Sequence, residues 1–210
     1  EELAIEYIDD IKLTIEPGVI INLNGNSLMV NGTLIARGSD NEKIYFTGGS
    51  IFLNGQSESD STIEHSVLTN LIQIDSGSPT ISSSLISGSF YVNGGTPLII
   101  ANNIDARLIV KDGAPSISNN VISDGIHADA KGGPVTITNN ELTSKNGFIV
   151  IYIQGIHAII SGNKIIGNNK MGIYIWLRIS SALIEDNQIS NCTTGIWADA
   201  GAGASDMQIV

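Results

Sequence analysis

The chain has 210 residues, of which 10 are Lys or Arg and 21 are Asp or Glu, and its formal net charge is −11. This length fits a single domain, residues 1–210, that can bury most of the surface its unfolded chain exposes. The acidic balance argues against a nucleic-acid partner, because phosphate binding needs a basic surface. Cys192 is the one cysteine, so neither an internal disulfide nor a multi-cysteine metal site can form.

No apolar run is long enough for a membrane span, which needs roughly 18 or more consecutive residues. The longest run, residues 148–160, is interrupted by Gln154, Gly155 and His157. The sequence starts at Glu1 without a basic, apolar leader, so we expect a mature or excised segment. Few Lys residues and many Asn, Ser, Thr and Gly residues are typical of secreted and surface proteins. We therefore expect an extracellular or cell-surface location, with the periplasm as an alternative.

The first elements along the chain are expected to be strands. Residues 1–12 are ambiguous between a strand and a short helix, and we expect them to cap one end of the fold. Residues 13–38 and 43–49 have the sequences LTIEPGVIINLNGNSLMVNGTLIARG and KIYFTGG. We expect strands here as well, and no segment of the chain shows a sustained helical period. At the other end, residues 201–210 are expected to form an exit segment, flexible or truncated.

From residue 62 onward an internal repeat organises the chain. Its seven copies are TIEHSVL, TISSSLI, IIANNID, SISNNVI, TITNNEL, IISGNKI and LIEDNQI. In each copy an Ile stands three residues before a Ser or Asn. The Ile positions are Ile63, Ile81, Ile100, Ile117, Ile137, Ile160 and Ile184, and the polar positions are Ser66, Ser84, Asn103, Asn120, Asn140, Asn163 and Asn187. An apolar residue returns two positions after the polar one in every copy except at Asp105.

A second short apolar run follows each of the later repeats, and it commonly begins with Gly. Examples are GIHAD from Gly125, GFIVI from Gly147, GIYIW from Gly172 and GIWAD from Gly195. These runs alternate with period two and are too short for helices, so they predict strands. Short strands that recur about every 20 residues predict a solenoid, in which stacked coils bury one continuous core.

Stacking at about 4.8 Å per coil would place equivalent residues directly above one another. We expect the Ile positions to form internal columns. We expect the Asn positions to lie where the chain turns, because Asn tolerates left-handed backbone geometry and its amide can hydrogen-bond along the stack. This column is interpreted as structural rather than functional.

The repeat I-x-N-N-x-I followed by G-I-x-I resembles the right-handed parallel β-helix repeat. That repeat is shared by pectate-lyase-like enzymes, periplasmic copper-accessory proteins of the nitrous-oxide-reductase system, and many surface proteins. The pattern L-x-V-x-G-T-L-x-A-x-G from Leu28 is similar to the opening coils of secreted β-helix proteins. The resemblance covers about residues 13–200. It implies an all-β, single-stranded solenoid of about nine coils, but it describes a scaffold that carries many activities.

Alternation along the strands assigns two columns of outward residues. The first is Met29, Phe52, Gln73, Tyr91, Ile109, His127, Ile149, Tyr174 and Trp197, and the second is Asn54, Asp75, Asn93, Lys111, Asp129, Ile151, Trp176 and Asp199. The first column is largely apolar and would form a stripe of roughly 40 Å. An exposed apolar stripe of that size usually marks an interaction surface.

We expect this stripe to bind a polysaccharide or a surface protein, because rings with a polar edge suit stacking on sugars. The expected ligand-binding residues are Tyr174, Trp176, Trp197, Ile149, Ile151 and Tyr91. The alternatives are a homo-oligomer contact and a stripe covered by a terminal segment of the chain. The non-catalytic module is the preferred hypothesis, and a small polysaccharide lyase, glycoside hydrolase or epimerase is the other.

Catalytic residues are harder to find. The resemblance to pectate-lyase-like enzymes implies a Ca²⁺ cluster of acidic residues with an Arg or Lys, or else paired Asp residues. Asp129 and Asp199 would lie three coils, or about 14 Å, apart, which is too far for a glycosidase pair. The one acid–base group that the columns bring together is Lys111, Asp112, His127 and Asp129.

Metal binding is not expected. His65, His127 and His157 fall in different coils without the short spacing of a metal site. The acidic segment with Glu58, Asp60 and Glu64 could attract Ca²⁺, although a solvated loop is the preferred interpretation. We therefore predict no cofactor, with Ca²⁺ as the alternative.

Overall fold

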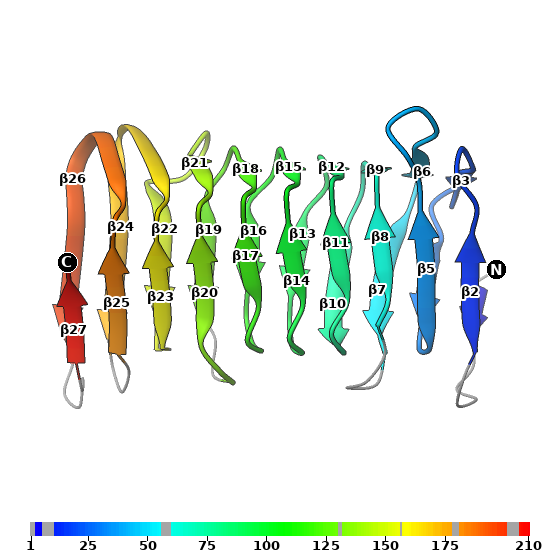
Figure 1. Ribbon diagram of the computed structural model, residues 1–210, viewed down its shortest axis with the longest axis horizontal. Coiled ribbons are helices and arrows are strands. Elements are labelled where there is room, and N and C mark those ends of the chain that lie inside the picture. The colour runs from blue at the N-terminus through cyan, green and yellow to red at the C-terminus, as the bar shows by residue number, and fades with distance from the viewer. Residues whose placement is uncertain are drawn as a thin grey trace.

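The computed structural model describes residues 3–5, 11–55, 60–129, 132–155, 157–177, 181–200 and 206–210. All regular structure in these residues is β, and all strand pairs between named strands are parallel. The strands stack one coil upon the next into an elongated solenoid, seen from the side in Figure 1. The expected fold class is therefore confirmed. The described residues include no helix long and apolar enough to cross a membrane.

One side of the solenoid is a ten-stranded sheet in strict chain order, which lies at the front in Figure 1. Its strands are β2 (Lys12–Ile15), β5 (Thr33–Arg37), β8 (Thr62–Glu64), β11 (Thr80–Ser82), β14 (Leu98–Ile100), β17 (Ser116–Ser118), β20 (Val135–Thr138), β23 (Ala158–Ser161), β25 (Ser181–Glu185) and β27 (Asp206–Ile209). Each coil contributes one strand, as a solenoid requires.

The other strands form a 17-stranded sheet that consists of two rows. The first row contains β3 (Ile20–Asn22), β6 (Ile44–Thr47), β9 (Ser66–Leu68), β12 (Leu85–Ile86), β15 (Asn103–Ile104), β18 (Val121–Ile122) and β21 (Glu141–Thr143). The second contains β1 (Leu3–Ile5), β4 (Ser27–Val30), β7 (Ser50–Asn54), β10 (Ile72–Ser76), β13 (Phe90–Val92), β16 (Leu108–Val110), β19 (Ile126–Asp129) and β22 (Ile149–Gln154). The long strands β24 (Lys164–Leu177) and β26 (Gln188–Ala200) belong to both rows and join them.

The core is one continuous stack of aliphatic side chains. The Ile column of the ten-stranded sheet pairs residue by residue from Ile63 to Ile184, and its members are almost fully buried. Each residue packs on the equivalent residue of the next coil because the strands are in register. β-branched side chains suit this arrangement, since they fill a pleated surface with little loss of rotamer freedom.

A buried amide ladder follows the Ile column at the corner after the ten-stranded sheet. Asn102, Asn120, Asn140 and Asn163 are almost fully buried. The backbone N–H of Asn120 donates to Oδ1 of Asn140 at 2.9 Å, and that of Asn140 donates to Oδ1 of Asn163 at 2.9 Å. The Nδ2 of Asn140 donates to the carbonyl oxygens of Ile117 and Thr138. The ladder therefore satisfies the backbone groups that the turn removes from the sheets.

Two details of the predicted ladder are wrong. Asn103 is exposed and Asn102 is the ladder residue, so the copy IIANNID is shifted by one position. Its buried column residue is Ile99 rather than Ile100, and Ile104, not Asp105, occupies the apolar position of this copy. The sequence IIANNI is compatible with either Ile99 and Asn102 or Ile100 and Asn103 at the two repeat positions. The buried side chain of Asn102 shows that the first alignment is correct.

The second detail is the backbone geometry. The left-handed residue is the one before each ladder residue, with φ of 56° at Asn119 and 55° at Asn139. The two consecutive Asn residues thus have separate tasks. The first adopts the turn conformation that Asn tolerates, and the second places its amide inside the stack.

The ends of the chain contain strands where the structure describes them. Residues 3–5, within the segment expected to cap the fold, form β1, which pairs with β4. Residues 206–209, within the expected exit segment, form β27, which pairs with β25.

The ladder predicts a large effect for Asn140→Leu. The change would remove the acceptor of the buried Asn120 N–H and one donor to the carbonyl oxygen of Ile117, whereas the carbonyl oxygen of Thr138 keeps the N–H of Asn119. Because an unsatisfied buried polar group costs about 1–3 kcal/mol, we expect the free energy of unfolding to fall by about that amount. Asn103→Leu, on the exposed neighbouring column, is the matched control. Equal urea midpoints for the two variants would contradict the ladder.

Candidate functional site

Aromatic side chains stack on the outward surface of the second row, which we call the aromatic face (β19, β22, β24 and β26). Strand pairing places His127, Tyr152, Tyr174 and Trp197 in one column. Ring centroids are 4.4 Å apart for His127 and Tyr152, 5.4 Å for Tyr152 and Tyr174, and 6.4 Å for Tyr174 and Trp197. We call these four residues the aromatic ladder.

The first three rings of the ladder cover one another. Tyr152 and Tyr174 are stacked with 29° between their planes, so each shields a face of the other from solvent. Trp197 is inclined by 68° to Tyr174 and is 51% exposed. The inner rings therefore stabilise the coil stack, by about 0.5–1.5 kcal/mol per pair, and Trp197 at the end offers the free aromatic surface.

Two expected members of the columns are wrong. Ile151 is fully buried, because it pairs with Ile126 in the core register. Ile149 pairs with Met171 and lies outside the aromatic column, whose position in this coil belongs to Tyr152. In the second column Gln154 takes the place expected for Ile151, between Asp129 and Trp176.

The other expected binding residues lie on the outward surface. Tyr174 and Trp197 are paired neighbours, and Trp176 pairs with Asp199 in the next column, as their spacing predicts. Tyr91 lies further towards the N-terminal end, and the Nζ of Lys111 lies 4.9 Å from its ring centroid. Ligand binding by these residues stays a prediction.

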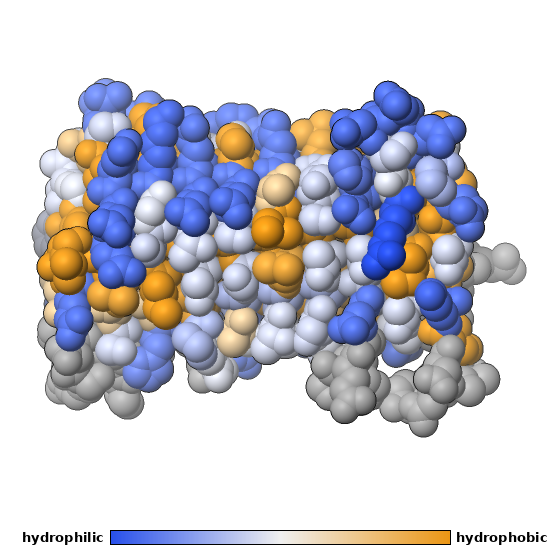
Figure 2. Space-filling view, viewed as in Figure 1, coloured by the Kyte–Doolittle hydropathy of each residue, from blue (hydrophilic) through white to orange (hydrophobic). Residues whose placement is uncertain are grey.

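The ten-stranded side has a different character. Its outward positions include many small hydroxyl side chains, among them Thr62, Thr80, Ser116 and Thr136. Figure 2 shows this side as mostly pale in the hydropathy colours, with polar side chains gathered along one corner and apolar spots that are separate from one another. The two tryptophans lie in β24 and β26, away from this sheet.

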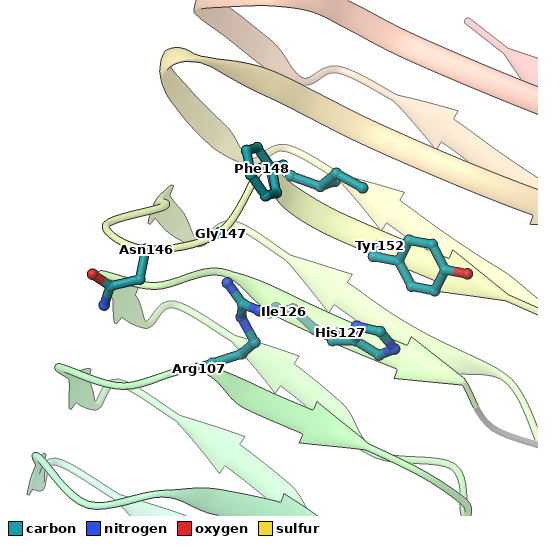
Figure 3. Close-up of a pocket in the computed structure, with 8 residues that line it drawn as sticks. Arg107, Ile126, His127, Asn146, Gly147, Phe148 and Tyr152 are labelled. Carbon is teal, nitrogen blue, oxygen red and sulfur yellow. The ribbon is translucent and has the colours of Figure 1, made fainter.

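A pocket of about 340 Å³ adjoins the aromatic ladder. The aromatic residues that line it are His127, Tyr152 and Phe148, and the polar ones are Arg107 and Asn146. Figure 3 shows Arg107 extended towards Gly147, with His127 and Tyr152 from adjacent strands beside it. The hydroxyl of Tyr152 donates to Oε1 of Gln154, so the tyrosine lines the pocket with its ring.

The loop at residues 144–148 forms the rim of this pocket, and Asp124 holds it from the coil below. One oxygen of Asp124 accepts the backbone N–H of Lys145 at 3.0 Å and that of Asn146 at 2.8 Å. The Nε of Arg107 donates to the carbonyl oxygen of Asp124, and Nη2 lies 3.6 Å from its carboxylate. The guanidinium also packs so closely on Gly147 that a Cβ there would collide with it.

The coil above holds the same loop from the other side. The Nζ of Lys170 donates to the carbonyl oxygens of Ser144 and Lys145, and the backbone N–H of Met171 donates to that of Phe148. Phe148 nevertheless projects from the loop with 90% of its surface exposed. The loop therefore presents a large apolar ring on an ordered backbone, which lowers the entropy cost of binding at this position.

Burial is the main influence on His127. It lowers the pKa of the imidazole below its usual value, and the positive charge of Arg107 lowers it further, while Asp129 has the opposite, smaller effect. His127 is therefore neutral at pH 7, because the ordinary histidine pKa is about 6.5.

The four candidate acid–base residues occupy separate environments. Lys111 lies over Tyr91, and the described ion pairs include none between Lys111 and Asp129. Asp112 accepts the backbone N–H of Gly113 in a turn. His127 packs on Tyr152, and Asp129 is exposed in the next column. Their catalytic role stays a prediction.

The described residues contain no group of three or more His, Cys, Asp or Glu side chains placed to hold a metal ion. His65 lies 3.1 Å from Asp40, and Nδ1 of His157 lies 2.7 Å from the hydroxyl of Ser181. Of the acidic segment considered for Ca²⁺, Glu58 lies outside the described residues.

Comparison with known proteins identifies the scaffold. Residues 106–210, half of the chain, match the family model described as right handed beta helix region. The chain therefore belongs to the right-handed β-helix family, as the repeat I-x-N-N-x-I led us to expect. No curated protein and no solved structure matches the chain significantly. Since this fold carries many activities, the family establishes the scaffold and leaves the site to be argued from its residues.

Sequence reasoning missed Tyr152, Gln154 and Phe148. Aligning the coil by its Gly147 displaced the register, because Ile149 pairs with Met171 and Ile151 with Ile173, so that Val150 rather than Gly147 takes the place opposite Gly172. A usable signal was present: the run IYIQ from Ile151 matches IYIW from Ile173 position by position.

The environment of His127 predicts a pH dependence of stability. A histidine whose pKa is lowered by folding binds its proton more readily in the unfolded state, so the stability it contributes is present above about pH 6.5 and is lost as the pH falls. The variant His127→Phe keeps a ring against Tyr152 but does not titrate. Between about pH 7 and pH 5, the free energy of unfolding of the wild type should therefore decline relative to that of the variant. Parallel profiles in urea unfolding would show that His127 makes no such contribution.

Proposed function

We propose that this chain is a non-catalytic, extracellular or cell-surface module that binds a polysaccharide on its aromatic face. The observation that carries the proposal is the half-exposed Trp197 at the end of a stacked ladder, with Trp176 in the adjacent column. Leaving an indole ring in contact with water is unfavourable, and a polar residue at the same position would avoid this cost. Contact with a ligand recovers that free energy.

The geometry suits a polymer. The rings of the ladder recur once per coil. The strands β24 and β26, which carry Tyr174 and Trp197, are directly paired, so the aromatic face is continuous there. Each ring is held by its neighbour, so little side-chain freedom is lost on binding. A chain of sugar units presents flat, weakly polar faces, and Trp197 offers such a face its exposed ring at the end of the ladder.

The pocket next to His127 supplies polar groups at one end of the face. Arg107 and Asn146 offer N–H donors, and Phe148 offers an exposed ring on the rim. Aromatic walls combined with a few placed donors are typical of small-molecule and sugar sites. Arg107 is fixed by Asp124, so its guanidinium is already oriented before a ligand arrives.

The alternative, a polysaccharide lyase, hydrolase or epimerase, needs an acid and a base within reach of one sugar unit. The hydroxyl of Tyr152 is directed to Gln154, and Asp112 is engaged in a turn. These contacts favour binding over catalysis. Assays for reducing sugars and for unsaturated products decide between the two.

The proposed function predicts that Trp197→Ala lowers the affinity for a polysaccharide by about tenfold or more, because one aromatic contact of this kind is lost. The melting temperature should change little, since the side chain is half exposed. Trp176→Ala should weaken binding as well. Tyr45→Ala, a change at a 39% exposed ring of β6 on the other row, should leave the affinity unaltered.

A glycan array followed by titration calorimetry with the purified chain measures these effects. Absence of binding to every glycan would contradict the proposal. A dimer in analytical ultracentrifugation that Trp197→Ala converts to monomer would show that the aromatic face is an oligomer contact instead. Product formation in the assays above would establish an enzyme.

A further inference from the structure

The cations near the aromatic face are engaged by the protein itself. Arg107 is paired with Asp124, Lys145 with Asp105, and Lys164 with Glu141. Lys170 donates to two backbone carbonyl oxygens of the loop at 144–148, and Lys111 lies over Tyr91. Each of these five positive charges thus has a partner within the chain.

The carboxylates on the same face are in a different situation. Asp129 and Asp199 are exposed in the column next to the aromatic ladder, and no ion pair involves either of them within the residues that the structure describes. Asp199 is the strand neighbour of Trp176 and lies two positions after Trp197. Among the residues that the structure describes, the charge that remains available beside the tryptophans is therefore negative.

We infer that the ligand of the aromatic face is cationic: a polysaccharide that carries free, protonated amino groups, as in a polymer of de-N-acetylated amino sugars. This inference rests on the proposed function and specifies its ligand class. An ammonium group is attracted to the face of a Trp or Tyr ring and to a carboxylate, and Trp176, Trp197 and Asp199 provide both within two adjacent strands.

The charge of the whole chain acts in the same direction. At −11 it attracts polycations from solution and repels acidic polymers such as uronates, and this attraction raises the rate of encounter at low salt. The burial of His127 keeps its ring uncharged at neutral pH, so the ladder adds no positive charge that would oppose a cationic ligand. The sugar rings would supply the apolar contact, and the amino groups the specificity.

The test compares three oligosaccharides of equal length: β-1,4-linked glucosamine, its fully N-acetylated form, and β-1,4-linked glucose. Titration calorimetry with the complete chain at about pH 6, where such amines are protonated, measures each affinity. We expect the glucosamine oligomer to bind at least about tenfold more tightly than the other two. Raising the ionic strength should reduce this preference, because salt screens exposed charges.

The variant Asp199→Asn should weaken binding of the glucosamine oligomer severalfold and leave binding of the neutral oligomers unchanged. Asp186→Asn is the matched control: the residue is exposed at another corner of the terminal coils, and its φ of 54° suits Asn. It removes the same charge, so an equal loss in both variants would reflect net charge rather than a site at Asp199.

The outcomes separate the inference from the proposed function. Equal binding of all three oligosaccharides, without salt dependence, would overturn the cationic ligand and leave polysaccharide binding intact. Binding of none of them, nor of any glycan on the array, would overturn both. Binding of poly-lysine with no binding of the glucosamine oligomer would show that the cationic partner is a polypeptide and would also overturn the inference.

Discussion

Parallel stacking in register is the constraint on which this molecule depends. When strands repeat at one fixed spacing, every side chain meets its equivalents in the coils above and below. Apolar positions then form columns such as the one from Ile63 to Ile184, and a buried polar position is tolerated only if its neighbours can pair with it. The amide ladder meets this condition because each Asn both accepts from one neighbour and donates to the other.

The same constraint shapes the aromatic face. Aromatic rings placed one above another cover each other's faces. The stacked inner rings therefore stabilise the fold, and only the ring at the end of the row exposes a face to ligands. Tyr152 and Tyr174 illustrate the first role and Trp197 the second. The pocket arises where the repetition is interrupted: the loop at 144–148 leaves the coil outline, and neighbouring coils anchor it through Asp124 and Lys170.

Much of the fold could be predicted from the sequence because repetition supplies many observations of one rule. The Ile and Asn columns follow from aligning the copies, and one ambiguous copy, IIANNID, was enough to misplace Asn103 by one position. The site was predicted only in part. Tyr174, Trp176 and Trp197 follow from two similar runs, whereas Phe148 and Arg107 depend on a loop that occurs once, and a pattern seen once cannot be aligned.

The corner made by a left-handed residue and the ladder residue after it affects which coils fold first. At His65, Ser83 and Ala101 the left-handed turn is adopted by residues that tolerate it less readily than Asn, whereas the later coils use Asn119, Asn139, Gly162 and Asp186. These later coils therefore have the stronger local preference for their final shape. In a solenoid, where each coil contacts only its neighbours, such coils are the natural nucleus, and we expect order to spread from the second half of the chain towards the N-terminal coils.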